Sequence, residues 1–285
     1  MTTASSIPHS PFPIPDAIAF IGGGNMARSL IGGLLARGVS AASIRVAEPV
    51  ETVRESLARD FGVPVFATAL EAAADASLWV LAVKPQVMRT VCEGMAASAR
   101  SGMPLVVSIA AGITAAQMQR WLGGDIAVIR AMPNTPALLG AGVTGLFATA
   151  QVDAAGRERA EKLLSSAGRT VWVDEEAKMD AVTAVSGSGP AYVFLLAEAM
   201  EEAAKSEGLS DHAARTLVLQ TILGAARMLT ESEEAPAELR KRVTSPNGTT
   251  QAAIETFQEG GFAKLVGKAI HAASERGKEL SAAND

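Results

Sequence analysis

The chain has 285 residues, of which 48% are hydrophobic, so it is long enough to fold as two domains with separate cores. Its 25 basic and 30 acidic side chains leave a net charge of −5, which argues against nucleic acid or an anionic membrane as a partner. The single cysteine, Cys92, excludes an intramolecular disulfide, and His9, His212 and His271 are too far apart for a metal-binding motif. We therefore expect a cytoplasmic protein that acts on small molecules without a metal.

The first 16 residues are rich in proline and contain no basic residue, so they do not have the pattern of a signal peptide. We expect residues 1–16 to form a disordered tail. Charges, or glycine and proline, interrupt every apolar run before it reaches the roughly 18 residues that a membrane span needs. No membrane segment is expected.

From Ala17 onward, short β-branched runs alternate with alanine-rich stretches in which apolar residues recur at three- and four-residue spacing. This alternation predicts an α/β domain over residues 17–176, a Rossmann-like, doubly wound parallel sheet with crossover helices. The expected strands are Ala17–Gly22, Ser43–Glu48, Val63–Phe66, Leu78–Val83, Leu105–Ser108, Ala127–Met132, Val143–Ala148 and Arg169–Val173. The expected helices are Met26–Arg37, Val50–Phe61, Pro85–Arg100, Thr114–Trp121 and Asp153–Ala167.

After Glu176 the β-branched runs disappear and alanine, leucine and glutamate dominate, which predicts an all-helical C-terminal domain over residues 177–285. Several of its stretches, such as "AYVFLLAEAM", are apolar on nearly all sides, and about a hundred residues can bury only a limited apolar surface. We therefore expect part of this domain to pack against a second subunit. Its expected helices are Ala177–Ser186 and Pro190–Glu207, either separate or continuous through a kink, then Asp211–Thr230, Pro236–Val243, Thr250–Gly260 and Gly261–Ser281.

The stretch "GGGNMA" lies directly between the first expected strand and the first expected helix. Gly22, Gly24 and Ala27 fit the pattern G-x-G-x-x-A of dinucleotide-binding turns. In this pattern the first glycine permits a tight turn, the second lets a pyrophosphate approach the backbone, and the small third residue allows helix and strand to pack closely. The amides of the helix N-terminus then face the phosphates.

Glu48 stands 21 residues beyond Ala27, close to the spacing of the acid that binds the ribose hydroxyls. A carboxylate there repels a 2′-phosphate, so Glu48 favours NADH over NADPH, an inference that the nearby Arg45 and Arg54 weaken. The alternative interpretation, a solvated glutamate at a strand end, remains open.

Two further stretches predict ligand contacts. "LAVKPQ" places Lys84 and Pro85 at the carboxyl edge of the sheet, where Lys84 either approaches a phosphate or ribose or is simply solvated. "RVTSPNGTTQAAIETF" places hydroxyls and free amides at the start of a helix, a site for a carboxylate or a phosphate, or else plain N-capping.

These motifs, in order "FIGGGNMARSL", "LAVKPQ", "SIAAGIT", "RAMPNTPA", "DAVTAVSGSGPAYVF" and "VTSPNGTTQAAIETF", are similar to those of the pyrroline-5-carboxylate reductase family. The resemblance covers nearly everything from Ile18 to Leu280. It implies hydride transfer from NADPH or NADH to 1-pyrroline-5-carboxylate, giving L-proline. It also implies a helical domain that interlocks with that of a second copy into a homodimer, often assembled further into rings of dimers.

The resemblance also implies the site residues. Those expected to hold the cofactor are Gly22, Gly23, Gly24, Asn25, Met26, Ala27, Glu48, Ala82, Val83, Lys84 and Pro85, with Ile109, Ala110 and Ala111 beside the nicotinamide. Those expected to hold the substrate are Ser245, Thr249, Thr250 and Glu176, with Thr250 polarising the ring nitrogen.

Two positions depart from the family pattern. Family members often carry a small polar residue at the position of Glu48. The glutamate here puts the family's usual NADPH preference in doubt for this chain. Asn247 stands where a glycine is common, and asparagine also accepts left-handed backbone angles.

Two other classes remain as alternatives. A 3-hydroxyacid dehydrogenase has a similar two-domain plan, but it places a catalytic lysine near an asparagine. Here Lys178 has no such neighbour. A non-catalytic dinucleotide-sensing protein is expected to lose the hydroxyl-rich anion site, which is intact here as "TSPNGTT".

Overall fold

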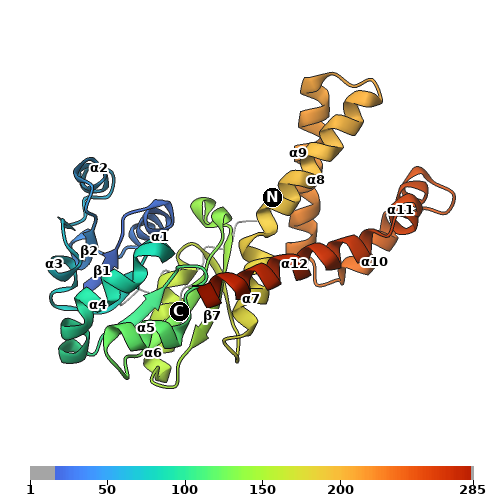
Figure 1. Cartoon of the computed structure of the whole chain (residues 1–285). Coiled ribbons are helices and arrows are strands. Elements are labelled where there is room, and N and C mark those ends of the chain that lie inside the picture. Colours follow the sequence, from blue (N-terminus) through green and yellow to red (C-terminus); the bar gives the residue numbers. More distant parts are fainter. Residues whose placement is uncertain (1–16, 284–285) are drawn as a thin grey trace. The chain divides into compact units, whose positions relative to one another are not determined.

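The computed structural model describes residues 17–283, and the tail expected over residues 1–16 lies outside this range (Figure 1). The chain divides into two compact units. The first unit contains the residues up to Gly187 together with those from Ala273 onward, and the second unit is Ser188–Ala272. The first unit extends 11 residues beyond the change in composition after Glu176, and the end of the last helix returns to it.

An eight-stranded sheet forms the core layer of the first unit, in the order β3-β2-β1-β4-β5-β6-β7-β8. The expected strands are all present, and β1 to β6 run parallel. However, β7 pairs antiparallel with β6, because the nine residues 133–141 between them are too few for a crossover between parallel strands. The strands are β1 (Ala17–Ile21), β2 (Ile44–Ala47), β3 (Val65–Phe66), β4 (Ala76–Leu81), β5 (Leu105–Ser108), β6 (Val128–Met132), β7 (Gly142–Ala148) and β8 (Gly168–Trp172).

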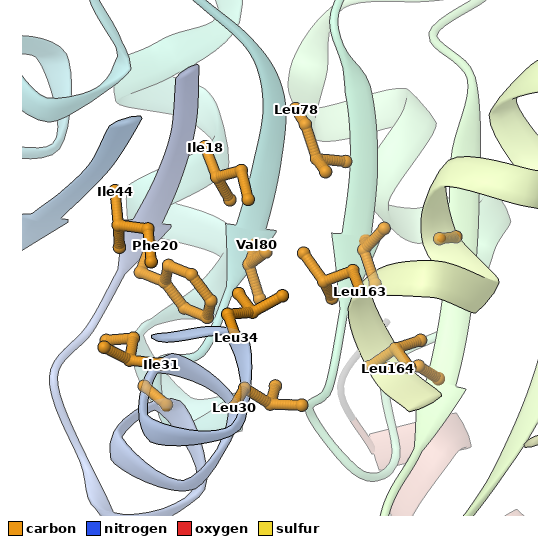
Figure 2. Close-up of a cluster of buried hydrophobic side chains, with 14 of the residues drawn as sticks. Ile18, Phe20, Leu30, Ile31, Leu34, Ile44, Leu78, Val80, Leu163 and Leu164 are labelled. Carbon is orange, nitrogen blue, oxygen red and sulfur yellow. The ribbon is translucent and has the colours of Figure 1, made fainter. Parts of the chain in front are cut away.

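Helices cover both faces of this sheet. Successive side chains of each strand point to opposite sides, and the apolar side chains on both sides are buried under helices. Ile18 and Phe20 of β1 belong to one buried cluster with α1, α2 and α6, shown in Figure 2, whereas Ala19 and Ile21 belong to a second cluster with α3, α4 and α5. The helices are α1 (Asn25–Ala36), α2 (Glu51–Phe61), α3 (Ala69–Ala73), α4 (Pro85–Gly102), α5 (Ala115–Leu122) and α6 (Ala154–Ser165), with 3₁₀ turns η1 (Ala41–Ser43) and η2 (Thr135–Leu139).

The end of the first unit packs along β6 and β7. Helix α7 (Lys178–Val182) continues into a π-helical segment, η3 (Thr183–Gly187), and α8 (Gly189–Ser206) follows after one residue. The sequence left open whether these helices are separate or continuous through a kink. In the structure a π-helical segment stands between them, and such segments are a recognised cause of kinks. Asn134, which follows β6 by two residues, donates from Nδ2 to Ser186 O at 3.1 Å and so holds η3 to the sheet.

The second unit is helical, and much of its apolar surface is exposed in one copy of the chain. None of the side chains of α8 or of α11 is buried, and Phe194, Leu195 and Leu265 are 67%, 66% and 64% exposed. Besides α8, the unit contains α9 (Asp211–Glu231), α10 (Pro236–Arg242), α11 (Thr249–Glu259) and the first part of α12 (Phe262–Ala283). Among the helices of residues 17–283, none is long and apolar enough to cross a membrane.

Candidate functional site

Three neighbouring strands bring the predicted cofactor loops to one edge of the sheet. The last residues of β1, β4 and β5 are partners in register, Ile21 with Leu81 and Leu81 with Ser108. The strand order reverses between β1 and β4, and open α/β sheets bind ligands at the carboxyl ends of the strands at such a switch point. The loops that begin directly after these strand ends are Gly22–Ala27, Ala82–Pro85 and Ile109–Ala111.

A pocket of about 510 Å³ opens at this edge. It is lined by the glycine turn, by Glu48 and by the predicted loop that contains Lys84. Seven further lining residues were not predicted from the sequence: Ile21, Ala47, Pro49, Ala67, Ala69, Val87 and Val91. A signal for the two valines was present, because they stand four residues apart in the first two turns of a helix opened by a proline and therefore share one helix face.

The three glycines of the turn have different surroundings. Gly22 has a φ of +105°, and a Cβ there would lie 2.7 Å from Ala82 O, so this position requires glycine. At Gly24, by contrast, no atom lies within 4 Å of where a Cβ would be, and no side chain caps the helix that follows. Open space beside the free amides of a helix N-terminus fits an approaching pyrophosphate.

Glu48 lies at the end of β2 and is hydrogen-bonded on both carboxylate oxygens. Its Oε2 accepts from Gly23 N at 3.1 Å, and its Oε1 accepts from Val50 N at 3.1 Å. Each oxygen keeps a second lone pair, so the carboxylate can still accept from a ribose hydroxyl at the pocket wall.

The two arginines near Glu48 make contacts with backbone carbonyls. Arg54 Nη1 donates to Glu48 O and to Pro49 O, both at 2.8 Å. Arg45 donates from Nε to Ala72 O at 2.8 Å and lies over the Phe66 ring, 4.4 Å from its centroid. Of the two guanidinium groups, that of Arg54 is therefore the one beside the β2–α2 turn, where a 2′-phosphate would arrive.

The loops after β4 and β5 are fixed by short polar contacts. Lys84 is exposed at the N-cap of α4, and Pro85 is the first residue of that helix. Ile109 N donates to Leu81 O at 3.1 Å, and Ala110 N donates to Ser108 Oγ at 3.3 Å. The backbone of the predicted nicotinamide loop is thus tied to both β4 and β5 at its start.

The predicted substrate hydroxyls lie together in the second unit, around the start of α11. Thr249 and Thr250 are its first two residues, Ser245 precedes them in the turn, and no side chain caps the helix. Gly248 N donates to Ser245 O at 3.0 Å, which closes the turn. Asn247 has a φ of +58°, which confirms the expectation that it adopts a left-handed conformation.

Glu176, the fourth predicted substrate residue, lies in the first unit. Its Oε1 accepts from Ala115 N at 2.6 Å and from Arg130 Nη1 at 3.3 Å. The structure therefore gives Glu176 protein partners in the unit of the cofactor loops, whereas Ser245, Thr249 and Thr250 belong to the other unit.

Cys92 is fully buried in α4. Burial raises the pKa of its thiol to about 12, since a thiolate would be poorly solvated there. A cysteine with so little thiolate at neutral pH is unsuited to nucleophilic or redox chemistry.

A glycine turn with room for a pyrophosphate, at the switch point of a doubly wound sheet, is the arrangement of the nicotinamide-dependent oxidoreductases. The chain is 56% identical to a pyrroline-5-carboxylate reductase of Pseudomonas aeruginosa, over 93% of this chain and 96% of that one. It belongs to the pyrroline-5-carboxylate reductase family, which confirms the family predicted from the sequence motifs.

Other comparisons agree. A family model described as pyrroline-5-carboxylate reductase dimerisation matches residues 176–280, and one described as NADP oxidoreductase, coenzyme F420-dependent, matches residues 17–112. The structure of a pyrroline-5-carboxylate reductase from Coxiella burnetii superposes with a TM-score of 0.91 at 42% identity, covering 93% of this chain and 98% of that one. That of a Plasmodium falciparum pyrroline carboxylate reductase with NADP bound has a TM-score of 0.81 at 26% identity, with 94% and 98% covered.

These matches support a nicotinamide dinucleotide cofactor and an oligomeric protein. They give no support to the alternatives, a 3-hydroxyacid dehydrogenase or a non-catalytic dinucleotide sensor.

Proposed function

We propose that this chain reduces 1-pyrroline-5-carboxylate to L-proline with NADPH or NADH, the last step of proline biosynthesis in the cytoplasm. The observation that carries the proposal is the match to reductases of this name over nearly the whole chain. The pocket at the glycine turn and the uncapped start of α11 support it, because the reaction needs a dinucleotide site and a carboxylate site.

The cofactor is held at the carboxyl edge of the sheet in this proposal. The residues assigned to it are Gly22, Gly23, Gly24, Asn25, Met26, Ala27, Glu48, Ala82, Val83, Lys84, Pro85, Ile109, Ala110 and Ala111. When bound, the reduced dinucleotide supplies a hydride. The protein contributes the free amides of the α1 N-terminus, the cation of Lys84 and a backbone loop that fixes the ring.

The substrate carboxylate is held by Ser245, Thr249 and Thr250 in this proposal, through their hydroxyls and the free amides at the start of α11. A protonated imine is already electrophilic, so placement contributes more to the rate than a strong acid would. Addition of hydride to the imine carbon forms a C–H bond and moves the C=N π pair onto nitrogen. The Thr250 hydroxyl, or a water, hydrogen-bonds that nitrogen.

Glu48 favours NADH over NADPH in this proposal. Its carboxylate lines the pocket and keeps lone pairs for a ribose diol, whereas a 2′-phosphate would bring two like charges together. Arg54, which is bound to the carbonyl of Glu48, moderates the preference.

The active form is a homodimer, assembled further into a ring of dimers, in this proposal. A family model of dimerisation covers residues 176–280, which include the helices whose apolar side chains are exposed in one copy. Burying such faces against a second copy is favourable, since obligate homodimer interfaces are rich in apolar side chains.

The test is turnover. Purified protein should consume 1-pyrroline-5-carboxylate, with loss of absorbance of the reduced dinucleotide and one L-proline formed for each cofactor oxidised. NADH and NADPH are compared at equal concentration. Absence of L-proline with both cofactors would contradict the proposal.

A further inference from the structure

A buried cation lies in the middle of β6. The Arg130 side chain is 5% exposed, and its guanidinium faces two carboxylates. Nη1 lies 3.3 Å from Glu176 Oε1, and Nη2 lies 3.8 Å from Asp180 Oδ1. Because an unpaired charge is costly to bury, this cation fixes both carboxylates where they are.

Glu176 has a second contact, and this one reaches the cofactor half of the sheet. Its Oε1 also accepts from Ala115 N at 2.6 Å, across 61 positions of sequence. Ala115 is the first residue of α5, so a negative charge sits at the positive end of that helix. Glu176 therefore links the Arg130 cation to the N-terminus of α5.

The segment between β5 and α5 begins with the loop Ile109–Ala111. Ile109 N and Ala110 N hold the start of this loop, as described above, whereas its continuation into α5 is held by Glu176. Ser108, just before the loop, is also the register partner of Arg130 on β6. The ion pair of Glu176 with Arg130 therefore joins β6, the strand beside the loop, to α5, the helix that follows the loop.

Two further contacts stabilise the same cluster from the end of α12. Gln117 Nε2 in α5 donates to Ser281 O at 3.2 Å. A Cβ at Gly277 would lie 3.2 Å from Asp180 Oδ1, so the α12 backbone packs closely on that carboxylate. The Glu176 and Asp180 side chains are 25% and 13% exposed, and the groups that contact them belong to the first unit.

We propose that Glu176, held by Arg130, is a positioning residue for the loop beside the nicotinamide, and that it is not a substrate ligand. The proposal rests on the proposed function, which puts the nicotinamide beside Ile109–Ala111. The bond from Ala115 N and the pairing with Arg130 converge on the same carboxylate oxygen. A shift of α5 in the absence of this anchor displaces the loop that precedes it.

The test compares Glu176→Ala with Glu176→Gln, whose side-chain oxygen still accepts from Ala115 N. The dissociation constant of NADPH is measured by calorimetry, and the KM of the imine is measured by turnover. Glu176→Ala should weaken NADPH binding by about tenfold, and Glu176→Gln should restore it to within about threefold of the wild type. The KM of the imine should stay within about twofold in both variants, because Glu176 does not touch the imine.

Glu158→Gln is the matched control, since it removes an exposed carboxylate of the same unit that pairs with Lys162 on the surface of α6. If Glu176→Ala does not fold, Arg130→Lys, which keeps the charge but loses the planar fork, should weaken NADPH binding by about threefold. A raised KM of the imine with an unchanged NADPH dissociation constant would overturn the proposal, as would unchanged NADPH binding in all variants. The calorimetry needs no turnover, so failure of the proposed function would be recognised separately.

Discussion

The carboxylate of Glu48 is hydrogen-bonded to the amide of Gly23, with 3.1 Å between Gly23 N and Glu48 Oε2. The side chain to which we assign cofactor selection therefore also supports the turn that we propose binds the pyrophosphate. Charge and turn geometry are coupled at this position, so substitutions of Glu48 must be chosen to separate the two effects.

Glu48→Gln removes the charge and keeps one oxygen acceptor for the turn. We expect the ratio of kcat/KM with NADPH to kcat/KM with NADH to rise by about tenfold, because the repulsion of a 2′-phosphate is lost. Steady-state rates with both cofactors measure this ratio. Glu48→Ser should shift the ratio in the same direction but lower both values, since the turn also loses support. An unchanged ratio in both variants would show that the carboxylate does not select.

Gly24→Ala and Gly22→Ala should have opposite signatures. The Cβ of Gly24→Ala enters open space, so the melting temperature should be unchanged while NADPH binding weakens by about tenfold, because the methyl group blocks the pyrophosphate. Gly22→Ala forces a left-handed φ and a 2.7 Å approach to Ala82 O, which should destabilise the fold by at least about 1–2 kcal/mol. Calorimetry and thermal unfolding distinguish the two. Tight NADPH binding by Gly24→Ala would remove this position from the pyrophosphate site.

Thr250→Ala tests the substrate site. We expect kcat/KM for the imine to fall by at least about tenfold, with NADPH binding unchanged, because we propose that the hydroxyl contacts the substrate and not the cofactor. Thr256→Ala is the control on the same helix, since its hydroxyl only bonds back to Ala252 O at 2.9 Å. Equal kinetics of the two variants would exclude Thr250 from the site.

Phe194→Asp tests the oligomer. This side chain on α8 is 67% exposed in one copy, and a charge there should dissociate the homodimer if the face is covered by a second copy. Sedimentation velocity reports the change in mass. Met103→Asp, at a 59% exposed apolar residue of the first unit, should leave the mass unchanged. A monomeric wild-type protein would contradict the assignment at once.

Much of the fold could be predicted because its signals are local. The strand-turn-helix at Gly22 follows from a β-branched run, a glycine that adopts a positive φ and an apolar helix period. Helix α3 was not predicted, because five residues are too few to show a helical period. A signal was nevertheless present in the letters "TALE", since Thr68 and Glu71 form a capping box. The antiparallel direction of β7 was not predicted, although its link from β6 is too short for a parallel crossover.

The residues of the site could be predicted only where they belong to one continuous sequence motif or stand at a known spacing from it. Glu48 was found by its spacing, but its bond to Gly23 depends on a side-chain conformation that no spacing encodes. Arg130 was missed because its partners, Glu176 and Asp180, are 46 and 50 positions away, and only the folded sheet brings them to it. For the same reason the sequence predicted a substrate contact for Glu176, and it did not predict the hydrogen bond from Ala115 N that the structure shows.

The second unit is inserted between the two parts of the first, since the chain returns to the first unit at Ala273. During translation, Gln117 is made long before Ser281, whose carbonyl accepts its amide, and all of Ser188–Ala272 is made in between. The dinucleotide unit is therefore begun first but cannot acquire its last helical contact until the inserted unit has left the ribosome. A nascent chain arrested before Ala273 lacks the α12 carbonyl that accepts from Gln117, so its first unit is missing this contact.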